Sequence, residues 1–307
     1  MAGFYREETE YKKSIELYEK ALKINPQNPS IVNNLAKVYF DIEDLEMAEK
    51  YCLKAYKMDS NDGNITKILS LIYLRKQNYK LGWSFFDGRL NLSDFIEKNS
   101  TIKSIREKLL KEREKLNKNS NILVLREQGV GDEILYGTMY NDLFKNFNNV
   151  TIECDPRLKN IFCNSFPKEK NRFVNIGLVS KDEKKLEEYD TIIYAGSLGK
   201  IFRNKIEDFD DGCYLSVDNE IFRKTKKELK VLANKINIGI SWKSFKNRYA
   251  NEKSLGLEDF KYLFQTDDCN FINLQYGEVD DELDHYNKKY KKNIITLKNI
   301  DLFNDFD

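Results

Sequence analysis

A spacing of about 34 residues recurs through the first third of this 307-residue chain. Three sets of positions show it: Ser14, Tyr18, Ala21 and Pro26; Ala48, Cys52, Ala55 and Ser60; Gly82, Phe86 and Arg89. A second series repeats Leu35, Ala36 and Tyr39 as Leu69, Ser70 and Tyr73. Because small residues recur where two helices would cross, the spacing predicts stacked pairs of helices.

A helical repeat of about 34 residues is the tetratricopeptide (TPR) period. Apolar positions between Ile15 and Ile24 form a helical stripe, which ends at the Asn25–Pro29 segment. We therefore predict TPR helices over residues 1–92. Stacked repeats present an extended groove, so a protein partner or protein acceptor is the expected ligand of this region.

Charge and cysteine content exclude several classes of protein. The 51 Lys+Arg and 50 Asp+Glu give a net charge of +1, and the two signs alternate along the chain, which argues against a dedicated nucleic-acid or membrane-surface protein. No membrane span or signal peptide is evident, so we expect a cytoplasmic protein. The five cysteines are scattered and form no C-x-x-C pair, so no disulfide framework or metal site is expected.

From residue 121 the pattern changes to short apolar runs that alternate with helices, which is typical of parallel βαβ units. We predict a helical linker over 93–120, a first α/β domain over 121–235 and a partial second one over 236–307. A long charged helix, Asn219 to Lys235, ends the first domain. The predicted strands are Ile122–Arg126, Val150–Cys154, Phe173–Ile176, Thr191–Ala195, Ile236–Trp242, Phe271–Gln275 and Ile294–Leu297.

The first candidate site is the turn after the first of these strands. Gly129 and Gly131 let the backbone turn sharply and approach a ligand, and Asp132 falls near the N-terminus of the next helix. The dinucleotide fingerprint fails here because Ile134 stands where its third glycine belongs. On spacing alone, Asp132 is either a ligand-facing carboxylate or a helix-capping one.

The second candidate site is the loop that follows the strand ending at Trp242. It contains Lys243, Arg248, Lys253 and Ser254 and leads to a predicted helix over Leu257 to Phe264. Cations and hydroxyls at the carboxyl end of a strand suit a phosphate or diphosphate, although a solvated basic loop has the same composition. Trp242 either stacks on a base or sugar or belongs to the core.

Taken together, four segments resemble those of bacterial TPR proteins with a C-terminal heptosyltransferase-like (family nine) glycosyltransferase region of GT-B architecture. The segments are LGWSFFDGRL, LREQGVGDEILYG, AGSLGKIF and IGISWKS with the RYANEKSLGLEDF and FINLQYG that follow. The implied fold is α + α/β: TPR helices followed by two Rossmann-like domains, the second incomplete.

The resemblance also implies roles for the candidate residues. Asp132 would be the general base that deprotonates an acceptor hydroxyl, with Glu133 in reserve. Lys253, helped by Lys243 and Arg248, would neutralise the departing nucleoside diphosphate without a metal ion. The implied activity is inverting transfer of a sugar from a nucleotide-sugar to a protein or polysaccharide, with no cofactor besides the donor substrate.

The resemblance is incomplete at its C-terminal side. Relatives continue with an aspartate-rich turn, a Ser/Thr and a histidine, none of which is present, so turnover by these residues alone is not expected. The last strand, Ile294–Leu297, would then leave an unpaired sheet edge. The alternative function is a TPR interaction scaffold with a non-catalytic α/β platform. Convergence of Asp132 with the loop cations would favour the enzyme, and a binding groove on the repeats would favour the scaffold.

Overall fold

The computed structural model describes residues 1–98, 116–230, 232, 235–245, 253–291, 293–297 and 300–304. The chain forms two compact units. The first contains residues 1–154 and 174–213, and the second contains residues 155–173 and 214–307.

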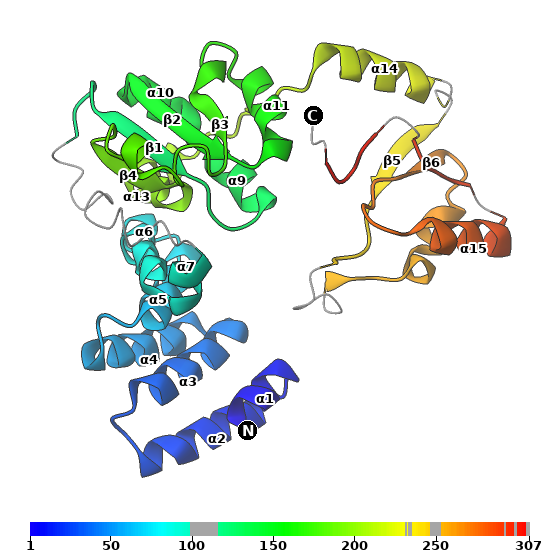
Figure 1. Cartoon of the computed structure of the whole chain (residues 1–307). Helices are drawn as coiled ribbons and strands as arrows, with labels where there is room; N and C mark the ends of the chain where they lie inside the picture. Colours follow the sequence, from blue (N-terminus) through cyan, green and yellow to red (C-terminus); the bar gives the residue numbers. More distant parts are fainter. Residues whose placement is uncertain are drawn as a thin grey trace. The chain divides into compact units, whose positions relative to one another are not determined.

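The N-terminal part of the first unit is entirely helical (Figure 1). Its elements are α1 (Ala2–Glu7), α2 (Tyr11–Ile24), α3 (Pro29–Asp41), α4 (Leu45–Met58), α5 (Gly63–Arg75), α6 (Tyr79–Phe86), the 3₁₀ helix η1 (Asp87–Asn91) and α7 (Ser93–Lys98). Consecutive helices pack against each other as pairs, and α3 also contacts α5. The predicted helical N-terminal region is therefore observed, and its boundary at residue 92 stays a prediction.

The turns and caps of these helices repeat with the same spacing as the side chains. Thr9, Glu43 and Gln77 each adopt a left-handed backbone conformation, with φ of 59°, 63° and 59°. The side chains of Asn28, Asp44, Asp62 and Asn78 accept hydrogen bonds from backbone N–H groups in the first turns of α3, α4, α5 and α6. Each helix pair thus reuses one turn geometry and the same cap chemistry.

Small residues allow the helices of each pair to cross closely. Ser14, Ala48 and Gly82 are all buried, and a Cβ at Gly82 would lie 2.7 Å from the Leu74 side chain. The helices enclose a core of Val32, Ala36, Ala48, Cys52, Ala55, Ile65, Ile68, Leu69, Ile72 and Tyr73. The sequence prediction of small residues at the crossings is therefore confirmed.

The α/β part that follows the repeats contains a four-stranded sheet. Its strands are β1 (Asn121–Leu125), β2 (Asn149–Cys154), β3 (Phe173–Asn175) and β4 (Thr191–Tyr194), in the order β3-β2-β1-β4. β1 pairs in parallel with both β2 and β4. The connecting helices are α9 (Val130–Gly137), α10 (Tyr140–Asn146), α12 (Glu183–Leu186), the 3₁₀ turn η4 (Ala195–Ser197), α13 (Leu198–Phe202) and the 3₁₀ turn η5 (Ile206–Asp208).

The repeats and this sheet share one core. Leu123, Leu125 and Tyr194 are buried in the sheet, and Leu90 and Phe95 from the end of the repeat region pack against the same cluster. Apolar strands buried by helices are typical of parallel sheets. The last repeat is therefore attached to the sheet by packing as well as by the chain.

The second unit contains a smaller parallel sheet in the order β5-β6-β7. Its elements are α11 (Pro156–Ser165), η3 (Lys170–Arg172), α14 (Asn219–Lys230), β5 (Ile236–Ile240), η7 (Leu257–Phe260), η8 (Leu263–Gln265), β6 (Cys269–Asn273), α15 (Asp280–Tyr290) and β7 (Ile294–Ile295). The seven predicted strands are all observed, and each of their ends lies within two residues of the predicted one. The parallel α/β architecture is thus observed, and the GT-B assignment stays a prediction.

One predicted helix is wrong. Leu257 to Phe264 forms two short 3₁₀ turns, η7 and η8, instead of one α-helix. Leu257 and Phe260 lie three residues apart, so a 3₁₀ turn places both toward the core cluster around Trp242 and Phe271.

Two other predictions extend beyond what the structure describes. Of the predicted linker 93–120, α7 is helical and residues 116–120 are not, whereas 99–115 lie outside the described residues. The helix predicted over Asn219–Lys235 is observed from Asn219 to Lys230. The domain boundaries drawn from the sequence remain predictions.

The edge of the second sheet is partly covered from within the chain. Among the described strands, β7 has β6 as its one strand neighbour, as expected from the sequence. The Asn287 side chain of α15 accepts a hydrogen bond from the Ile294 N–H (2.9 Å) and donates one to its carbonyl (3.4 Å). A side-chain amide therefore satisfies part of the edge that a further strand would otherwise pair with.

Candidate functional site

The first helices of successive repeats carry polar side chains that lie near one another. Asn34, Lys37 and Asp41 lie on one side of α3 because they are spaced by three and four residues. Arg6 of α1 donates to Asp41 at 2.5 and 3.1 Å. Lys67 is an exposed residue of α5, the helix of the next repeat that contacts α3. We call these five residues on α1, α3 and α5 the first-helix face.

Lys37 stands at the centre of the first-helix face. Its side chain is half-buried, and Nζ donates to Asn34 Oδ1 at 3.2 Å. Burial lowers the pKa of Lys37, and the positive charges of Arg6 and Lys67 lower it further, against the opposing effect of Asp62. The environment of this ammonium group therefore favours the arrival of a negative charge.

The Gly129–Asp132 turn lies where the sequence predicted it, between β1 and α9. Gly129 is the residue before the helix, and its N–H donates to Asp132 Oδ2 at 3.0 Å. Asp132 is therefore the third residue of the helix, its carboxylate caps the first turn by accepting from the residue before the helix, and its side chain is half-exposed. A Cβ at Gly131 would have no heavy atom within 4 Å, so the turn is open on this side.

Glu133 points into the protein, unlike Asp132. It is fully buried, and its Oε1 lies 2.5 Å from the Nε of Arg126. The ion pair with the guanidinium offsets part of the cost of burying this carboxylate. This contact gives Glu133 a structural partner, and its proposed role as reserve base stays a prediction.

A side chain of the repeat region contacts the segments that follow β1 and β4. Arg89 of η1 reaches Glu127, which follows β1, with hydrogen bonds of 2.7 and 2.6 Å, and reaches Ser197, which follows β4, at 3.0 Å. Strand order reverses between β1 and β4, and open α/β sheets usually bind ligands at that switch point. A protein side chain therefore fills the position where a ligand would be expected.

The Arg89–Glu127 pair is fully embedded in polar contacts. Glu127 Oε1 also accepts from the Gly196 N–H at 2.6 Å, and Asp87 accepts from both Arg89 (3.2 Å) and Ser197 (2.6 Å). Burial acts to lower the pKa of Arg89, but the charge and hydrogen bonds of Glu127 raise it overall. No role was predicted for this pair from the sequence. A signal was nevertheless present, because Arg89 is a charged residue within the apolar segment FFDGRLNL and Glu127 is one that follows a buried strand.

Two glycines allow side chains to pack closely where the last repeat meets the first sheet. A Cβ at Gly196 would lie 2.7 Å from Glu127 Oε1, and a Cβ at Gly199 would lie 2.5 Å from the Trp83 ring. Three of the four segments used for the family resemblance therefore meet at one place: the end of the last repeat, the segment after β1 and the segment after β4. Their residues join the repeats to the sheet.

In the second unit, the predicted phosphate loop is only partly described. Trp242 is buried in the core, and the Lys243 ammonium forms an ion pair with Glu282. Ser254 Oγ accepts a hydrogen bond from the Ser244 N–H at 3.0 Å, and Lys253 is exposed. Arg248 lies outside the described residues.

Gln275 fixes the start of this loop and was not identified from the sequence. It is buried after β6, and its Oε1 accepts from the N–H groups of Trp242 (2.8 Å) and Lys243 (2.7 Å). Its amide nitrogen donates to the Lys243 carbonyl at 3.1 Å. One side chain thus holds the carboxyl ends of β5 and β6 together and fixes the backbone at Lys243.

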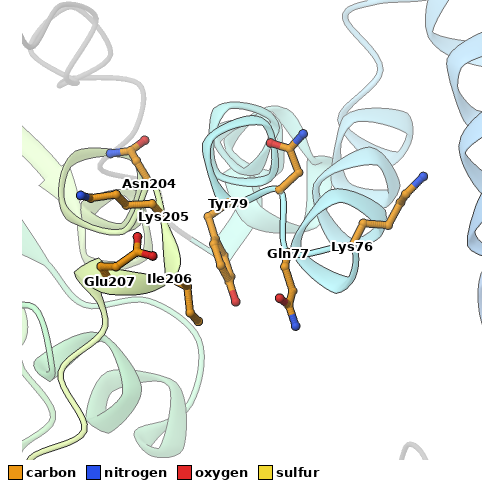
Figure 2. A pocket seen from close by; sticks show the side chains of 8 residues that line it. Lys76, Gln77, Tyr79, Asn204, Lys205, Ile206 and Glu207 are labelled. Atoms are coloured by element: carbon orange, nitrogen blue, oxygen red, sulfur yellow. The ribbon is translucent and has the colours of Figure 1, made fainter.

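A polar pocket of about 460 Å³ lies within the first unit (Figure 2). Residues 76–79 of the α5–α6 turn line one side and residues 204–207 line the other. The Lys76 ammonium is bonded to Glu46 and Glu49 at 2.7 and 2.6 Å, and the Tyr79 ring contacts Phe209 at 4.9 Å. Lys76 and Tyr79 of the lining therefore have partners within the first unit.

Neither a metal site nor a membrane span is found in the described part of the chain. No three His, Cys, Asp or Glu side chains there are grouped to hold a metal ion. None of the helices described combines the length and the apolar character that crossing a bilayer requires.

Comparison with known proteins identifies the repeats. A family model described as "TPR repeat" matches residues 5–42, and one described as "Tetratricopeptide repeat" matches residues 29–62. The TPR prediction is therefore confirmed for this part of the chain. Beyond residue 62, the same turn and cap geometry continues through α5 and α6.

One similar curated protein is Protein FlbA of Caulobacter vibrioides, which is 22% identical over 309 residues. The alignment covers 96% of this chain and 51% of that protein, so the chain spans about half the length of this relative.

Solved structures that resemble part of the chain are TPR domains. One is the first TPR of Spaghetti (RPAP3) bound to HSP90 peptide SRMEEVD, with 20% identity and a TM-score of 0.29, covering 34% of this chain and 85% of that one. Another is the Sgt2 TPR domain from Aspergillus fumigatus, with 25% identity and a TM-score of 0.29, covering 34% of this chain and 75% of that one.

Proposed function

We propose that this chain is a protein-binding protein whose first-helix face holds an acidic peptide segment of its partner. The observation that carries the proposal is Lys37. Its half-buried ammonium stands at the centre of the face, and the charges of Arg6 and Lys67 destabilise its protonated form. A carboxylate at this position would relieve that repulsion and gain a charge-assisted hydrogen bond.

The α/β part supports a scaffold role in this proposal. Arg89 lies at the switch point of the first sheet, and its hydrogen bonds to Glu127 and Ser197 attach the last repeat to that sheet. Such an attachment holds the repeat surface in one conformation before the partner arrives, which reduces the entropy lost on binding.

Binding of a labelled peptide tests this function. The probe is a fluorescein-labelled peptide rich in Asp and Glu, and its partner probe has Asn and Gln at the same positions. We expect the acidic peptide to bind and Lys37→Gln to weaken it by about tenfold, the loss of one charge-assisted hydrogen bond. The matched control is Lys54→Gln, an exposed lysine on α4, which lies outside the first-helix face.

Equal binding of the acidic and neutral peptides would contradict the proposal. So would equal losses in the Lys37 and Lys54 variants, because binding would then depend on overall charge and not on this face.

A second candidate function is the glycosyl transfer that the sequence resemblance implies. In its favour, Asp132 is half-exposed at the start of α9, directly after β1, and Lys243, Lys253 and Ser254 follow β5 of a parallel sheet. In this proposal Asp132 acts as base, and Lys253 and Ser254 contact the diphosphate of a nucleotide-sugar.

Calorimetric titration with uridine, guanosine, adenosine and cytidine diphosphates tests this second candidate. We expect one nucleotide to bind and Lys253→Ala to abolish its binding. The control is Lys261→Ala, an exposed lysine of the same unit outside the loop. If the folded chain binds none of the four, the second candidate fails and the peptide-binding proposal is unaffected.

A further inference from the structure

Helix α14 of the second unit buries none of its residues. Its largest apolar side chain, Phe222, is 51% exposed. Asp218 accepts hydrogen bonds from the N–H groups of Glu220 (2.8 Å) and Ile221 (3.0 Å), so the helix has a well-formed N-terminal cap. The chain therefore builds a regular helix whose apolar side chains are not buried in a core.

Side chains of α14 are sorted by type around its axis. With 3.6 residues per turn, one side carries Ile221, Phe222, Thr225 and Leu229. The opposite side carries the exposed cations Arg223, Lys227 and Lys230, and the exposed Lys226 lies at the border of the apolar side next to Phe222. An apolar stripe faced by a lysine-rich stripe is typical of helices that lie in the plane of a membrane interface.

The charge of α14 differs from that of the chain as a whole. Over residues 219–230 there are five Lys and Arg and two Glu, so the helix has a net charge of +3, whereas the whole chain has +1. One of these cations, Lys224, is paired with Glu220 at 2.8 Å. Among the described residues, no salt bridge is found for Arg223, Lys227 or Lys230. The balanced overall composition therefore conceals a local basic surface.

We propose that α14 binds the surface of an anionic lipid bilayer. Ile221, Phe222 and Leu229 would enter the boundary between head groups and acyl chains, and the cations would contact lipid phosphates. Lys226 Nζ lies 5.4 Å from the centre of the Phe222 ring, so a cation and an aromatic group reach the interface together. A lipid surface engages both stripes at once, whereas an acidic protein groove would engage the apolar stripe and only its flanking cations.

Vesicle flotation with the full chain tests the proposal. We expect binding to vesicles of phosphatidylcholine mixed with phosphatidylglycerol and little binding to phosphatidylcholine alone. Phe222→Ser should lower the partition coefficient by about tenfold, the loss of a half-buried aromatic side chain from the interface. Lys227→Glu should lower it by at least about fivefold, since each cation near an anionic surface contributes roughly 1 kcal/mol.

The matched control is the Tyr262→Ser variant. Tyr262 is 72% exposed in the same unit and has Lys261 over its ring at 4.8 Å, so it reproduces the pair of Phe222 and Lys226 outside α14. Fluorescence of the buried Trp242, in a Trp83→Phe background, verifies that each variant keeps the second unit folded.

Binding that falls in Phe222→Ser and not in Tyr262→Ser supports the proposal. Equal binding by the two variants overturns it, as does the absence of vesicle binding by the folded chain. Binding to poly-glutamate but not to anionic vesicles, with the same dependence on Phe222, also overturns it and assigns α14 to an acidic protein.

Discussion

Arg89 and Glu127 form a buried, two-bond ion pair that joins the last repeat to the first sheet. Arg89 Nε and Nη2 donate to the two carboxylate oxygens at 2.7 and 2.6 Å, and the side chains are 5% and 0% exposed. Two parallel hydrogen bonds between planar groups fix orientation as well as distance. The pair thus determines how the repeats meet the sheet within the first unit.

Glu127→Gln should destabilise the first unit by about 3 kcal/mol, because it removes the two-bond counter-charge of the buried Arg89 and leaves Asp87, at 3.2 Å, to offset that charge. Urea unfolding followed by Trp83 fluorescence measures the change. The chain has two tryptophans, Trp83 in the first unit and Trp242 in the second, so a Trp242→Phe background isolates the first.

Glu43→Gln is the matched control for the Glu127 prediction. Glu43 pairs with Arg75 on the surface of the same repeats, where both side chains are more than half exposed. We expect a loss below about 1 kcal/mol there. Similar losses in both variants would show that burial of the Arg89 pair has no special effect on stability.

Gly199→Ala should destabilise the first unit, whereas Gly131→Ala should not. A Cβ added at Gly199 would lie 2.5 Å from the Trp83 ring, so we expect a loss of about 1–3 kcal/mol from overpacking. At Gly131 the space is open, and alanine favours helix α9, so we expect no loss of stability. The same unfolding measurement compares them. Destabilisation by Gly131→Ala would contradict the open geometry of the turn.

Affinity for the acidic peptide should fall as pH rises. The fall should begin at a lower pH than it would for a lysine with the usual pKa. The ligand binds the protonated form of Lys37, whose pKa in the free protein lies below the usual 10.5. Affinity is therefore retained at neutral pH, where Lys37 is protonated and the peptide carboxylates are charged, and is lost as pH rises through that lowered pKa. Anisotropy titrations across the alkaline range measure this. Lys37→Arg stays charged and should shift the decline to higher pH; an unchanged profile would exclude Lys37 as the titrating group.

Cys52 should resist alkylation in the folded protein. It is fully buried in the repeat core, and burial raises its pKa to about 12, so the reactive thiolate is scarce at pH 8. Cys213 is exposed. Iodoacetamide labelling followed by mass spectrometry should modify Cys213 first and Cys52 only when the repeats unfold. Early labelling of Cys52 in native conditions would show that the repeats open readily.

Asn287→Ala should increase self-association. Without the amide, the N–H and carbonyl of Ile294 at the edge of β7 lose their partner and become available to another strand. Sedimentation velocity at increasing concentration measures this. The control is Lys288→Ala, the neighbouring position on α15, which should not change the self-association of the chain. Identical behaviour of the two variants would mean that Asn287 does not protect the edge.

Regular elements of this chain are predictable from its sequence because their signals are local. A recurring small residue such as Ala48 or Gly82 predicts a helix crossing, and apolar runs such as Ile192–Tyr194 predict buried strands. The signal is weaker between Leu257 and Phe264. Apolar residues there suit either an α-helix or two 3₁₀ turns, and core packing decides between them.

Much of the site was not predictable because its partners are distant in sequence. Arg89 and Glu127 are 38 residues apart, and Arg89 and Ser197 are 108 residues apart. No spacing rule connects such positions. The sequence also does not show in which direction each of two adjacent carboxylates points. Asp132 is half-exposed, whereas Glu133 is buried against Arg126.

The junction around Arg89 also restricts how this protein can be assembled by recombination. Repeat arrays are commonly gained, lost and exchanged as modules. Here the last helix pair supplies Trp83 and Arg89, and the sheet supplies Gly199 and Glu127 to receive them. An exchanged array without both side chains would leave an empty space and a buried carboxylate without its counter-charge. The last repeat and the first sheet must therefore be inherited together, whereas the earlier repeats can change in number or sequence.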